Sequence, residues 1–416
     1  MGKSSVLLSH PTGQLQGTVS LPASKSESNR LLIIQALARE SGKVSNLSSA
    51  RDTQTLLSIL QQTSTVWDVK DAGTTMRFLT AYAAIKGLEV EITGTQRMQQ
   101  RPIGILVEAL QKLGASIQYK SKAGYPPLQI GPFQYSGTNQ LEVNGSVSSQ
   151  FISALCMIAP LLPQGLKLML KGTPSSVPYI DLTLESIRRS GISASRIGSE
   201  INISPGKYTF KPVAVEPDWS SAGYWFSMAV LSRQANLALP GLLANSLQAD
   251  SAVLQFLKKL EFEGVSVKPG EITLTKNTGD KIVTKQLLFD FSHCPDLAQT
   301  AIVMLSALNV SFKITGLQSL KVKETDRIAA LQQELKPFGI NLVEISEDCF
   351  ENQGMFRFPN ETPTINTYED HRMAMAFAPL ALISKIKINE PDVVEKSYPE
   401  FWEHLQSLGF RVDQRT

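Results

Sequence analysis

The chain has 416 residues, 42% hydrophobic and 19% charged, which is enough to bury a sizeable core and favours a division into two domains. The formal net charge of +3 comes from basic residues scattered along the chain, without the patch or stripe that indicates nucleic-acid binding. The longest apolar runs, around 151–162 and 373–383, are well short of the ~20 residues that cross a bilayer.

The N-terminal residues lack the apolar core of a signal peptide. The three cysteines, Cys156, Cys294 and Cys349, are odd in number and show no metal-binding spacing. Unpaired cysteines are typical of a reducing compartment. We therefore expect a cytoplasmic enzyme.

Six segments begin with small polar or charged residues and continue into an alanine-rich apolar stretch. This pattern predicts a helix start, because Ser, Thr and Asp cap exposed backbone N–H groups. In chain order the six starts lie at 24–26, 73–77, 148–150, 218–221, 295–296 and 370–372. They recur at intervals of roughly 70 to 77 residues, with a shorter first interval of about 50, which is longer than most solenoid periods.

A second, amphipathic helix follows each apolar one and ends at a glycine or a turn. These helices are predicted at 109–114, 184–191, 256–264, 331–339 and 401–409, with 55–62 as a less regular first member. Period-two alternation predicts strands at 90–93, 166–170, 201–203, 272–274 and 312–314. The sequence therefore predicts six supersecondary units and an α/β or α+β fold.

Several of the helix starts carry a lysine or arginine, as at Lys25 and Arg372. The N-terminal end of a helix has partial positive charge, so a cation in its first turn is unfavourable unless an anion lies close by. The pattern indicates a site for an anionic small molecule.

The charged segment 323–327 precedes a helix predicted over 328–335, with Thr325 or Asp326 as its cap. Lys323 and Arg327 are four residues apart and have the same sign, which is mildly repulsive on a helix and opposed to its dipole. A solvated helix face is one interpretation of such a cluster. A bound external anion is the other, and it would remove both conflicts.

The segments 22–30, 71–77, 101–104, 148–150, 323–327 and 370–375, taken together and in this order, resemble the 5-enolpyruvylshikimate-3-phosphate synthase family. The similarity covers essentially the whole chain, and the ordered set is highly specific. It implies a two-domain inside-out α/β barrel of six βαβαββ units, three per domain. The implied domains are 22–214 and 1–21 plus 215–416, with hinges near residues 21 and 215 and substrates bound between domains that close on them.

The resemblance also implies an activity. The enolpyruvyl group of phosphoenolpyruvate would be transferred to the 5-hydroxyl of shikimate 3-phosphate, with release of phosphate by addition and elimination. This is a step of the shikimate pathway towards chorismate and the aromatic amino acids. The implied partners are these two small molecules, with no nucleic acid and no membrane, and we expect a monomer that needs no organic cofactor and no metal.

The resemblance assigns residues to each substrate, and both substrates carry a phosphate and a carboxylate that need paired cations when buried. Those implied for phosphoenolpyruvate are Lys25, Gly73, Arg101, Gln150, Arg327, Arg372 and Lys396. Those implied for shikimate 3-phosphate are Lys25, Ser26, Arg30, Ser148, Ser149, Gln150, Ser176, Tyr179, Asp296 and Lys323. Asp296 is the implied base, assisted by Lys25, and Glu324 is the implied proton donor.

Taken without the resemblance, the same residues support plainer interpretations. Asp296, which follows Pro295 at a helix start, is typical of a cap, and the same holds for Asp218 and Asp370. The spacing of His293, Cys294 and Asp296 fits no standard metal site.

Two other functions remain open. The sister enolpyruvyl transferase that acts on UDP-N-acetylglucosamine characteristically has a lysine-asparagine pair near its N-terminus and usually a reactive cysteine before its Arg-Pro motif. This chain has Lys25-Ser26 and no cysteine in 97–100, so both features count against that family. A non-catalytic anion-binding protein on the same fold would be favoured by loss of Lys25, Asp296 or Glu324, and all three are present.

The chain departs from the commonest family pattern at several positions. Asp71 stands where Asn is usual, Phe78 where Pro is usual and Glu369 where Asn is common. The carboxylate of Asp71, close to Gly73, would weaken phosphoenolpyruvate binding unless it faces away or is paired.

Overall fold

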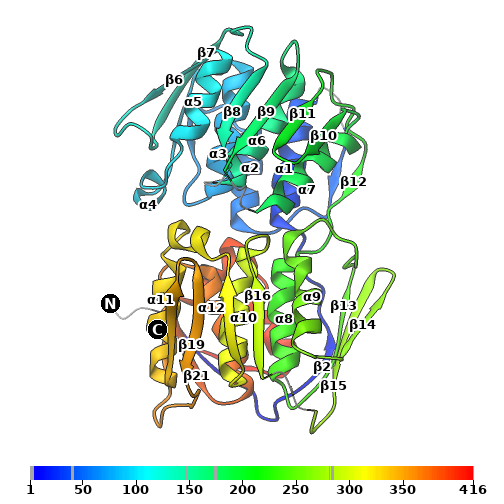
Figure 1. The fold of residues 1–416 in the computed structure, drawn as a ribbon, viewed down its shortest axis with the longest axis vertical. Helices are drawn as coiled ribbons and strands as arrows, with labels where there is room; N and C mark the ends of the chain where they lie inside the picture. Colours follow the sequence, from blue (N-terminus) through cyan, green and yellow to red (C-terminus); the bar gives the residue numbers. More distant parts are fainter. Residues whose placement is uncertain are drawn as a thin grey trace. The chain divides into compact units, whose positions relative to one another are not determined.

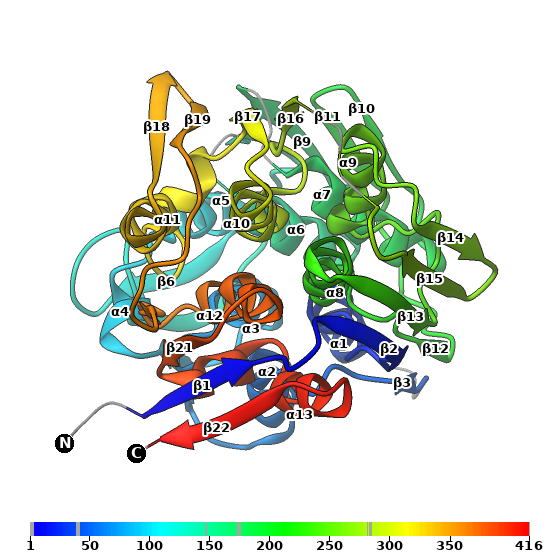
Figure 2. The same ribbon diagram turned by 90° about the horizontal axis from the view of Figure 1, so that it is seen from below.

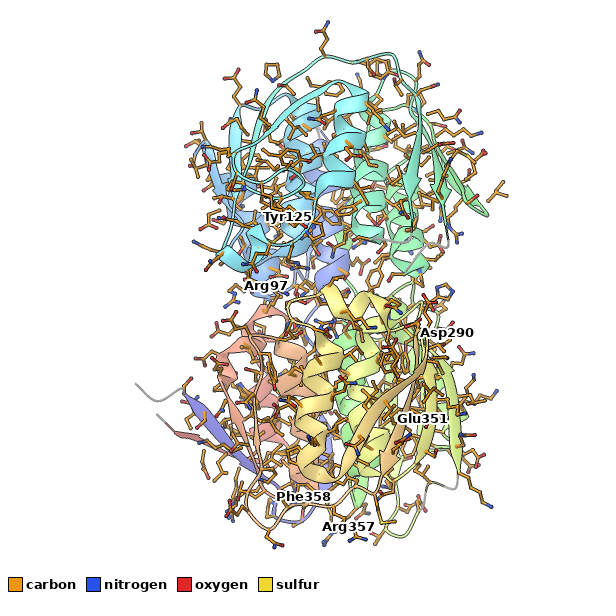
Figure 3. All side chains as sticks on the ribbon, turned by 60° about the vertical axis from the view of Figure 1, so that its left-hand side comes forward. Arg97, Tyr125, Asp290, Glu351, Arg357 and Phe358 are labelled. Carbon is orange, nitrogen blue, oxygen red and sulfur yellow. The ribbon has the colours of Figure 1, made fainter. Side chains whose placement is uncertain are left out.

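The computed structural model describes residues 4–38, 42–145, 148–172, 176–280, 282 and 285–415. The chain divides into two compact units, one formed by Met1–Pro22 with Glu216–Thr416 and the other by Ala23–Val215 (Figure 1). We call the first the discontinuous unit and the second the continuous unit. Charged side chains such as Arg97 of the continuous unit and Arg357 of the discontinuous unit lie exposed at the surface (Figure 3).

The continuous unit contains two complete copies of a βαβαββ repeat. The first comprises β4 (Val66–Asp68), α3 (Gly73–Lys86), β5 (Val90–Thr93), α5 (Gly104–Leu113), β6 (Ala115–Tyr119) and β7 (Leu128–Phe133), with the short α4 (Gln96–Gln99) inserted. The second comprises β8 (Gln140–Asn144), α6 (Ser149–Ile158), β9 (Leu166–Lys171), α7 (Val177–Arg189), β10 (Ala194–Ile197) and β11 (Glu200–Ile203). In both, the first two strands pair in parallel, and the fourth lies antiparallel between the second and the third.

The remaining repeat of this unit is smaller. It contains α1 (Lys25–Leu37) and α2 (Arg51–Gln61), and its sheet has only β3 (Val44–Ser45) paired in parallel with β12 (Val213–Ala214) in the described part of the chain. The shorter first interval between helix starts reflects this reduced copy.

The discontinuous unit contains three four-stranded sheets among its described residues. One repeat is continuous in sequence: β16 (Gln286–Asp290), α10 (Ala298–Ala307), β17 (Ser311–Thr315), α11 (Arg327–Leu335), β18 (Ile340–Ser346) and β19 (Cys349–Gly354). The second comprises α8 (Trp219–Leu231), β13 (Gln234–Pro240), α9 (Val253–Lys259), β14 (Val265–Lys268) and β15 (Glu271–Lys276). The third comprises β20 (Thr364–Ile365), α12 (His371–Phe377), β21 (Ile386–Asn389), α13 (Phe401–Ser407) and β22 (Arg411–Arg415).

The N-terminal segment completes the last two of these sheets. β1 (Ser5–Ser9) lies between β21 and β22, antiparallel to both, and β2 (Gln14–Thr18) pairs in parallel with β13. Residues at the start of the chain therefore belong to the same unit as the end of the chain.

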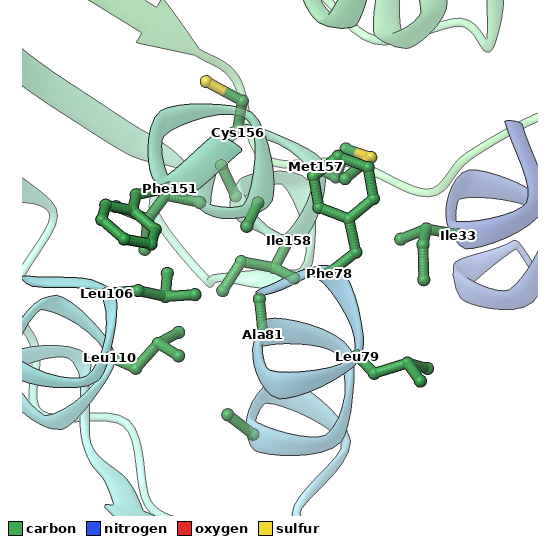
Figure 4. Packing of buried hydrophobic residues seen from close by; sticks show 14 of the residues in the cluster. Ile33, Phe78, Leu79, Ala81, Leu106, Leu110, Phe151, Cys156, Met157 and Ile158 are labelled. Carbon is green, nitrogen blue, oxygen red and sulfur yellow. The ribbon is translucent and has the colours of Figure 1, made fainter. Parts of the chain in front are cut away.

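The alanine-rich helices form the interior of each unit. In the discontinuous unit, α10 packs against α8 and α12, and the three sheets lie around these helices (Figure 2). Almost every residue of α8, α10 and α12 is buried, as expected for a helix that is apolar on all sides. In the continuous unit, one buried hydrophobic cluster includes Phe78 and Leu79 of α3, Leu106 of α5 and Met157 of α6, with Phe78 beside Met157 (Figure 4).

Most predicted elements are confirmed. The predicted strands lie within β5, β9, β11, β15 and β17, and the predicted amphipathic helices correspond to α2, α5, α7, α9, α11 and α13. The helix predicted to reach residue 264 is wrong at its end, because α9 stops at Lys259. Gly114, the C-cap of α5, has φ of 110°, a conformation that glycine adopts without the clash of a Cβ atom.

The departure at Phe78 has a structural explanation. Its ring is fully buried in the core of the continuous unit, and its centroid is 5.4 Å from Cζ of Arg30. The ring therefore supports a guanidinium as well as filling the core.

Among the described residues, none of the helices is long and apolar enough to span a membrane.

Candidate active site

The discontinuous unit brings Arg327 together with three carboxylates. Arg327 is the first residue of α11, and Asp326 caps this helix by accepting from the N–H groups of Ile328 and Ala329, each at 3.1 Å. Of the two caps predicted for this helix, Asp326 is confirmed. The cap places the Arg327 side chain, only 2% exposed, at the helix start.

All three nitrogens of the Arg327 guanidinium donate to carboxylates. Nε donates to Asp370 Oδ2 at 2.6 Å, Nη1 to Asp296 Oδ1 at 2.9 Å and Nη2 to Glu324 Oε2 at 2.9 Å. Burial disfavours the charge of Arg327, but these three carboxylates outweigh that effect and raise its pKa. The guanidinium therefore stays charged inside the unit.

Asp296 is in turn surrounded by cations. Oδ1 lies 2.9 Å from Arg327 Nη1 and 3.4 Å from Lys323 Nζ, and Oδ2 accepts from Arg372 Nη2 at 3.0 Å. Although burial opposes its ionisation, Arg372, Lys323 and Arg327 hold the pKa of Asp296 well below its usual range. Asp296 is a carboxylate at neutral pH and a weak base in this arrangement.

Glu324 and Lys396 complete this cluster. Lys396 Nζ lies 3.9 Å from Glu324 Oε1, and its side chain is only 1% exposed. We give the name charged cluster to the seven residues Asp296, Lys323, Glu324, Arg327, Asp370, Arg372 and Lys396. It unites every sequence-predicted site residue of the discontinuous unit and adds Asp370.

Two sequence interpretations of this cluster are wrong. Asp296 is not a helix cap, because it lies in the 3₁₀ turn Pro295–Leu297, whose N-cap is Cys294 and has no side-chain cap bond. Lys323 is not on the helix with Arg327, because α11 begins only at Arg327. The two cations thus meet at Asp296 instead of repelling one another along a helix.

The cap interpretation is confirmed for the other two aspartates. Asp218 accepts from the Ser221 N–H at 2.8 Å, and Asp370 accepts from the Arg372 N–H at 2.9 Å. Asp370 also pairs with Arg327, so it joins the starts of α11 and α12. Immediately before it, Tyr368 and Glu369 have positive φ angles of 54° and 57°, which explains why Asn, a residue that tolerates this conformation, suits position 369.

In the continuous unit, Arg30 is buried and contacts two other residues that were predicted for the same substrate, Ser26 and Tyr179. Nη1 donates to the Ser26 carbonyl oxygen at 2.8 Å, and Nη2 donates to the Tyr179 carbonyl oxygen at 3.2 Å. Nε donates to Thr183 Oγ1 at 2.7 Å. Burial lowers the pKa of Arg30 to about 10, which leaves it charged at neutral pH.

Lys25, the first residue of α1, has a carboxylate partner of its own. Its Nζ lies 3.4 Å from Asp52 Oδ2, and the Asp52 side chain is 5% exposed. Ser24 caps the same helix by accepting from the Glu27 N–H at 3.4 Å. Lys25 therefore begins a capped helix and has its charge compensated across to α2.

The start of α6 carries the predicted serines and glutamine. Ser148 is the N-cap and accepts from the Gln150 N–H at 3.3 Å, while Ser149 is the first helical residue. Gln150 Nε2 donates to Thr74 Oγ1 at 3.1 Å, which ties α6 to the start of α3. Ser176 lies at the start of α7 in a left-handed conformation, with φ of 56°.

Gly73 and Arg101 lie in direct contact. A Cβ atom added at Gly73 would lie 2.6 Å from Arg101 Nη1 and 2.8 Å from Arg77 Nη1. Arg101 Nε is buried and has no hydrogen-bond partner within the described ranges. No side chain caps α3, so the backbone N–H groups at Gly73 and the following residues are not satisfied by a cap. The pair is suited to an anion at a bare helix start.

Replacing Gly73 with alanine is expected to push the Arg101 guanidinium aside and to weaken binding of an anionic substrate about tenfold or more. Steady-state kinetics would show this as a raised KM for one substrate with a smaller change in kcat. Gly131→Ala is the matched control, because the three atoms nearest to its new Cβ all belong to Ser116 of the neighbouring strand, at 3.3 Å or more. Equal KM values for both variants would contradict the role of this contact.

The carboxylate of Asp71 is paired. Arg51 Nη2 lies 3.3 Å from Asp71 Oδ2 and 3.4 Å from Oδ1, and both side chains are partly exposed. The pair meets the condition under which Asp71 leaves an anion at Gly73 undisturbed.

Several contacting residues had no clear signal in the sequence. Asp52 stands in the first turn of α2, where an acidic residue is expected for the helix dipole alone. Ser153 and Thr183, which bind Arg30, lie inside apolar helix patterns. Their roles depend on which helices pack together, which local pattern does not specify.

Comparison with known proteins places these features in a family. The family model described as EPSP synthase (3-phosphoshikimate 1-carboxyvinyltransferase) matches residues 9–66 and 61–405. A 3-phosphoshikimate 1-carboxyvinyltransferase of Bacteroides fragilis (strain YCH46) is 47% identical over 411 residues, covering 98% of each chain. One of Laribacter hongkongensis (strain HLHK9) is 37% identical, covering 96% of this chain and 98% of its own.

A solved structure has the same fold. The EPSP synthase of Acinetobacter baumannii aligns with a TM-score of 0.80 at 20% identity and covers 99% of this chain and 100% of its own. At this identity the likeness concerns the fold alone, and it confirms the predicted fold class.

Proposed function

The chain belongs to the EPSP synthase (3-phosphoshikimate 1-carboxyvinyltransferase) family, and from that premise we propose that it transfers the enolpyruvyl group of phosphoenolpyruvate to the 5-hydroxyl of shikimate 3-phosphate. The products are phosphate and 5-enolpyruvylshikimate 3-phosphate, a precursor of chorismate and the aromatic amino acids. The observation that supports this function best is the charged cluster, in which cations converge on Asp296.

The charged cluster is suited to anions that exchange with its own carboxylates. Arg327, Arg372 and Lys323 are neutralised by Asp296, Glu324 and Asp370. A substrate phosphate or carboxylate can take the place of such a partner. The cation then stays paired, and the substrate anion is paired as well. The cations are thereby kept charged and oriented before substrate binds.

We assign the phosphoenolpyruvate anions to the forked and buried cations. Arg327, Arg372 and Lys396 would bind them from the discontinuous unit. Lys25, Gly73, Arg101 and Gln150 would contribute from the continuous unit. The contact of Gly73 with Arg101, and the buried Nε that Arg101 leaves available, support this assignment.

Shikimate 3-phosphate is assigned to hydroxyl and cationic groups at helix starts. From the continuous unit these are Lys25, Ser26, Arg30, Ser148, Ser149, Gln150, Ser176 and Tyr179, and from the discontinuous unit Asp296 and Lys323. The contacts of Arg30 with Ser26 and Tyr179 support their grouping. Helix starts favour a phosphate because their N–H groups and dipole point at it.

The acid–base step follows from the electrostatics of Asp296. The 5-hydroxyl oxygen bonds to C2 of phosphoenolpyruvate as its proton passes to a base, and C3 gains a proton from an acid. The C2–O bond to phosphate then breaks, and a proton leaves C3 to restore the double bond. Asp296 is the proposed base: once the substrate anions engage Arg372, Lys323 and Arg327, the groups that hold its pKa low are occupied and its basicity rises. Glu324 is the proposed acid, and Lys25 assists.

We further propose that the protein is a cytoplasmic monomer whose two units close on the substrates, because each unit carries only part of the assigned site. Neither nucleic acid nor membrane is a proposed partner. Small-angle scattering is expected to give the mass of one chain and a smaller radius of gyration when shikimate 3-phosphate is added. An unchanged radius at saturating ligand would contradict closure.

The activity is tested by phosphate release from purified protein with phosphoenolpyruvate and shikimate 3-phosphate. Turnover that depends on both substrates is the expected result. UDP-N-acetylglucosamine in place of shikimate 3-phosphate serves as the control for the sister transferase. No release with either acceptor would leave the chain a non-catalytic anion-binding member of the fold and overturn the proposal.

A further inference from the structure

Asp250 is a buried carboxylate that the proposed chemistry does not use. It lies in the 3₁₀ turn Ala249–Ala252, just before α9, and is 1% exposed. Its Oδ2 accepts from the Ser220 hydroxyl, whereas Oδ1 is buried with no hydrogen-bond partner among the residues that the structure describes. A half-satisfied buried carboxylate is costly to keep, which calls for an explanation.

Ser220 connects this carboxylate to Arg372. Arg372 Nη2 donates to Ser220 Oγ at 3.4 Å and to Asp296 Oδ2 at 3.0 Å. Because the Ser220 hydroxyl donates its proton to Asp250, its oxygen lone pairs are left for the guanidinium. A chain of donors therefore runs from Arg372 through Ser220 to Asp250, parallel to the direct bond from Arg372 to Asp296.

The charges that act on Asp250 come from three other elements. They are Arg372 on α12, Asp296 in the turn before α10 and Asp218 at the start of α8. Burial, followed by Asp296 and Asp218, raises the pKa of Asp250 to about 7, against the lowering effects of Arg372 and Ser220. The nearby Cys294 thiol has its own pKa raised by burial and stays neutral. Asp250 therefore exchanges its proton near neutral pH, whereas Asp296 stays ionised.

We propose that Asp250 is a positioning residue for Arg372: while ionised it restrains the guanidinium through Ser220, and it takes up a proton from solvent when a substrate anion binds Arg372. This inference rests on the proposed function, in which Arg372 binds phosphoenolpyruvate. It adds to that function a proton-linked step at a residue that does not touch substrate.

The sign of the linkage follows from the neighbouring charges. An anion bound at Arg372 adds negative charge where Asp296 already raises the pKa of Asp250, so it raises that pKa further. Because the linkage is reciprocal, phosphoenolpyruvate binds more weakly where Asp250 is ionised. The wild-type KM for phosphoenolpyruvate should therefore rise as pH increases through about 7.

The test compares pH profiles of wild type, Asp250→Asn and Ser220→Ala. The KM for phosphoenolpyruvate is measured from pH 6 to 8.5 at saturating shikimate 3-phosphate. The ratio of wild-type to Asp250→Asn KM is expected to grow about fivefold across this range, because the amide cannot ionise. Titration of the substrates themselves cancels in that ratio. In Ser220→Ala the rise should begin at higher pH, since the lost hydrogen bond stabilises ionised Asp250.

Asp413→Asn, which removes an exposed carboxylate from β22 of the same unit, is the matched control and should follow wild type. A pH-independent ratio between wild type and Asp250→Asn would overturn the inference while leaving the proposed function intact. Wild-type protein without turnover would instead overturn the function. Ser220→Ala distinguishes proton linkage from a folding defect of Asp250→Asn, because it keeps the Asp250 carboxylate. If the linkage is real, the KM for phosphoenolpyruvate must begin to rise at a different pH in Ser220→Ala than in wild type.

Discussion

Replacing Asp296 with asparagine is expected to lower kcat for phosphate release by about 100- to 10,000-fold, the range typical of losing a positioned acid–base group. The amide keeps the size of the side chain, but its single oxygen can accept from only one of Arg327 Nη1 and Arg372 Nη2, because these two donors bind different oxygens of Asp296. It cannot take the proton of the 5-hydroxyl. The chemical step should therefore fail, while Arg327 keeps Asp370 and Glu324 as partners and Arg372 keeps its bond to the Asp296 backbone carbonyl oxygen.

The KM for phosphoenolpyruvate distinguishes loss of chemistry from loss of binding. Asp296 competes with substrate anions for Arg327 and Arg372, so its neutral replacement should leave this KM unchanged or lower it. A variant that kept wild-type kcat would exclude Asp296 as the base. A lower kcat with a strongly raised KM would indicate that its role is to hold the cations.

Asp326→Asn is the matched control for this experiment. Asp326 is an exposed carboxylate adjacent to Arg327, and its structural role is to cap α11. Because asparagine caps helices about as well as aspartate, the variant should keep both stability and activity. It changes the charge of the region by the same amount as Asp296→Asn without touching the proposed base.

Local sequence predicted the helix starts because capping is a local interaction. Ser24, Ser148, Asp218 and Asp370 accept from N–H groups two or three residues ahead, within the range that a sequence pattern can specify. The prediction that polar residues cap every helix start is wrong for α3, which has no side-chain cap. Its bare N–H groups lie beside Arg101 instead.

Charge pairing could be predicted only in part. The conflict between a cation and a helix dipole correctly indicated that Lys25, Arg327 and Arg372 need counter-charges. It could not identify them, because Arg327 pairs with Asp370 43 residues away and Arg372 with Asp296 76 residues away. Such pairs form only when the starts of α10, α11 and α12 lie together. The chain supplies carboxylates where the sequence alone indicated an external anion.

This internal compensation connects stability with the proposed function. The cations cannot be buried without partners, and the substrates are not always present. Carboxylates that exchange with substrate groups pair the cations when substrate is absent and release them when substrate binds. One of these carboxylates, Asp296, is also the proposed base. The network therefore has to be strong enough to fold and open enough to exchange.

Replacing Arg327 with methionine is expected to destabilise the discontinuous unit by roughly 3–5 kcal/mol, because it leaves Asp370, Asp296 and Glu324 without their shared cation. Methionine keeps the apolar stem, so loss of packing contributes little. Urea unfolding followed by tryptophan fluorescence measures the change, since Trp219, Trp225 and Trp402 all lie in this unit. Arg357→Met, an exposed position on the same unit, should stay within about 0.5 kcal/mol of wild type.

The pH dependence of this loss separates a charge effect from a packing effect. In wild type, the lowered pKa of Asp296 stabilises the folded state at pH values above the pKa that this group has in the unfolded chain. This stabilisation is lost as the pH falls through the pKa of Asp296 in the folded state. In Arg327→Met the same carboxylate loses one of the cations that favour its charged form, so the folded variant binds a proton more readily than folded wild type. The destabilisation relative to wild type should therefore shrink as pH falls below about 4, the usual pKa of an aspartate, towards the lower pKa of Asp296 in folded wild type. A loss that is constant over this range would mean that Arg327 stabilises the unit by packing and not by its charge.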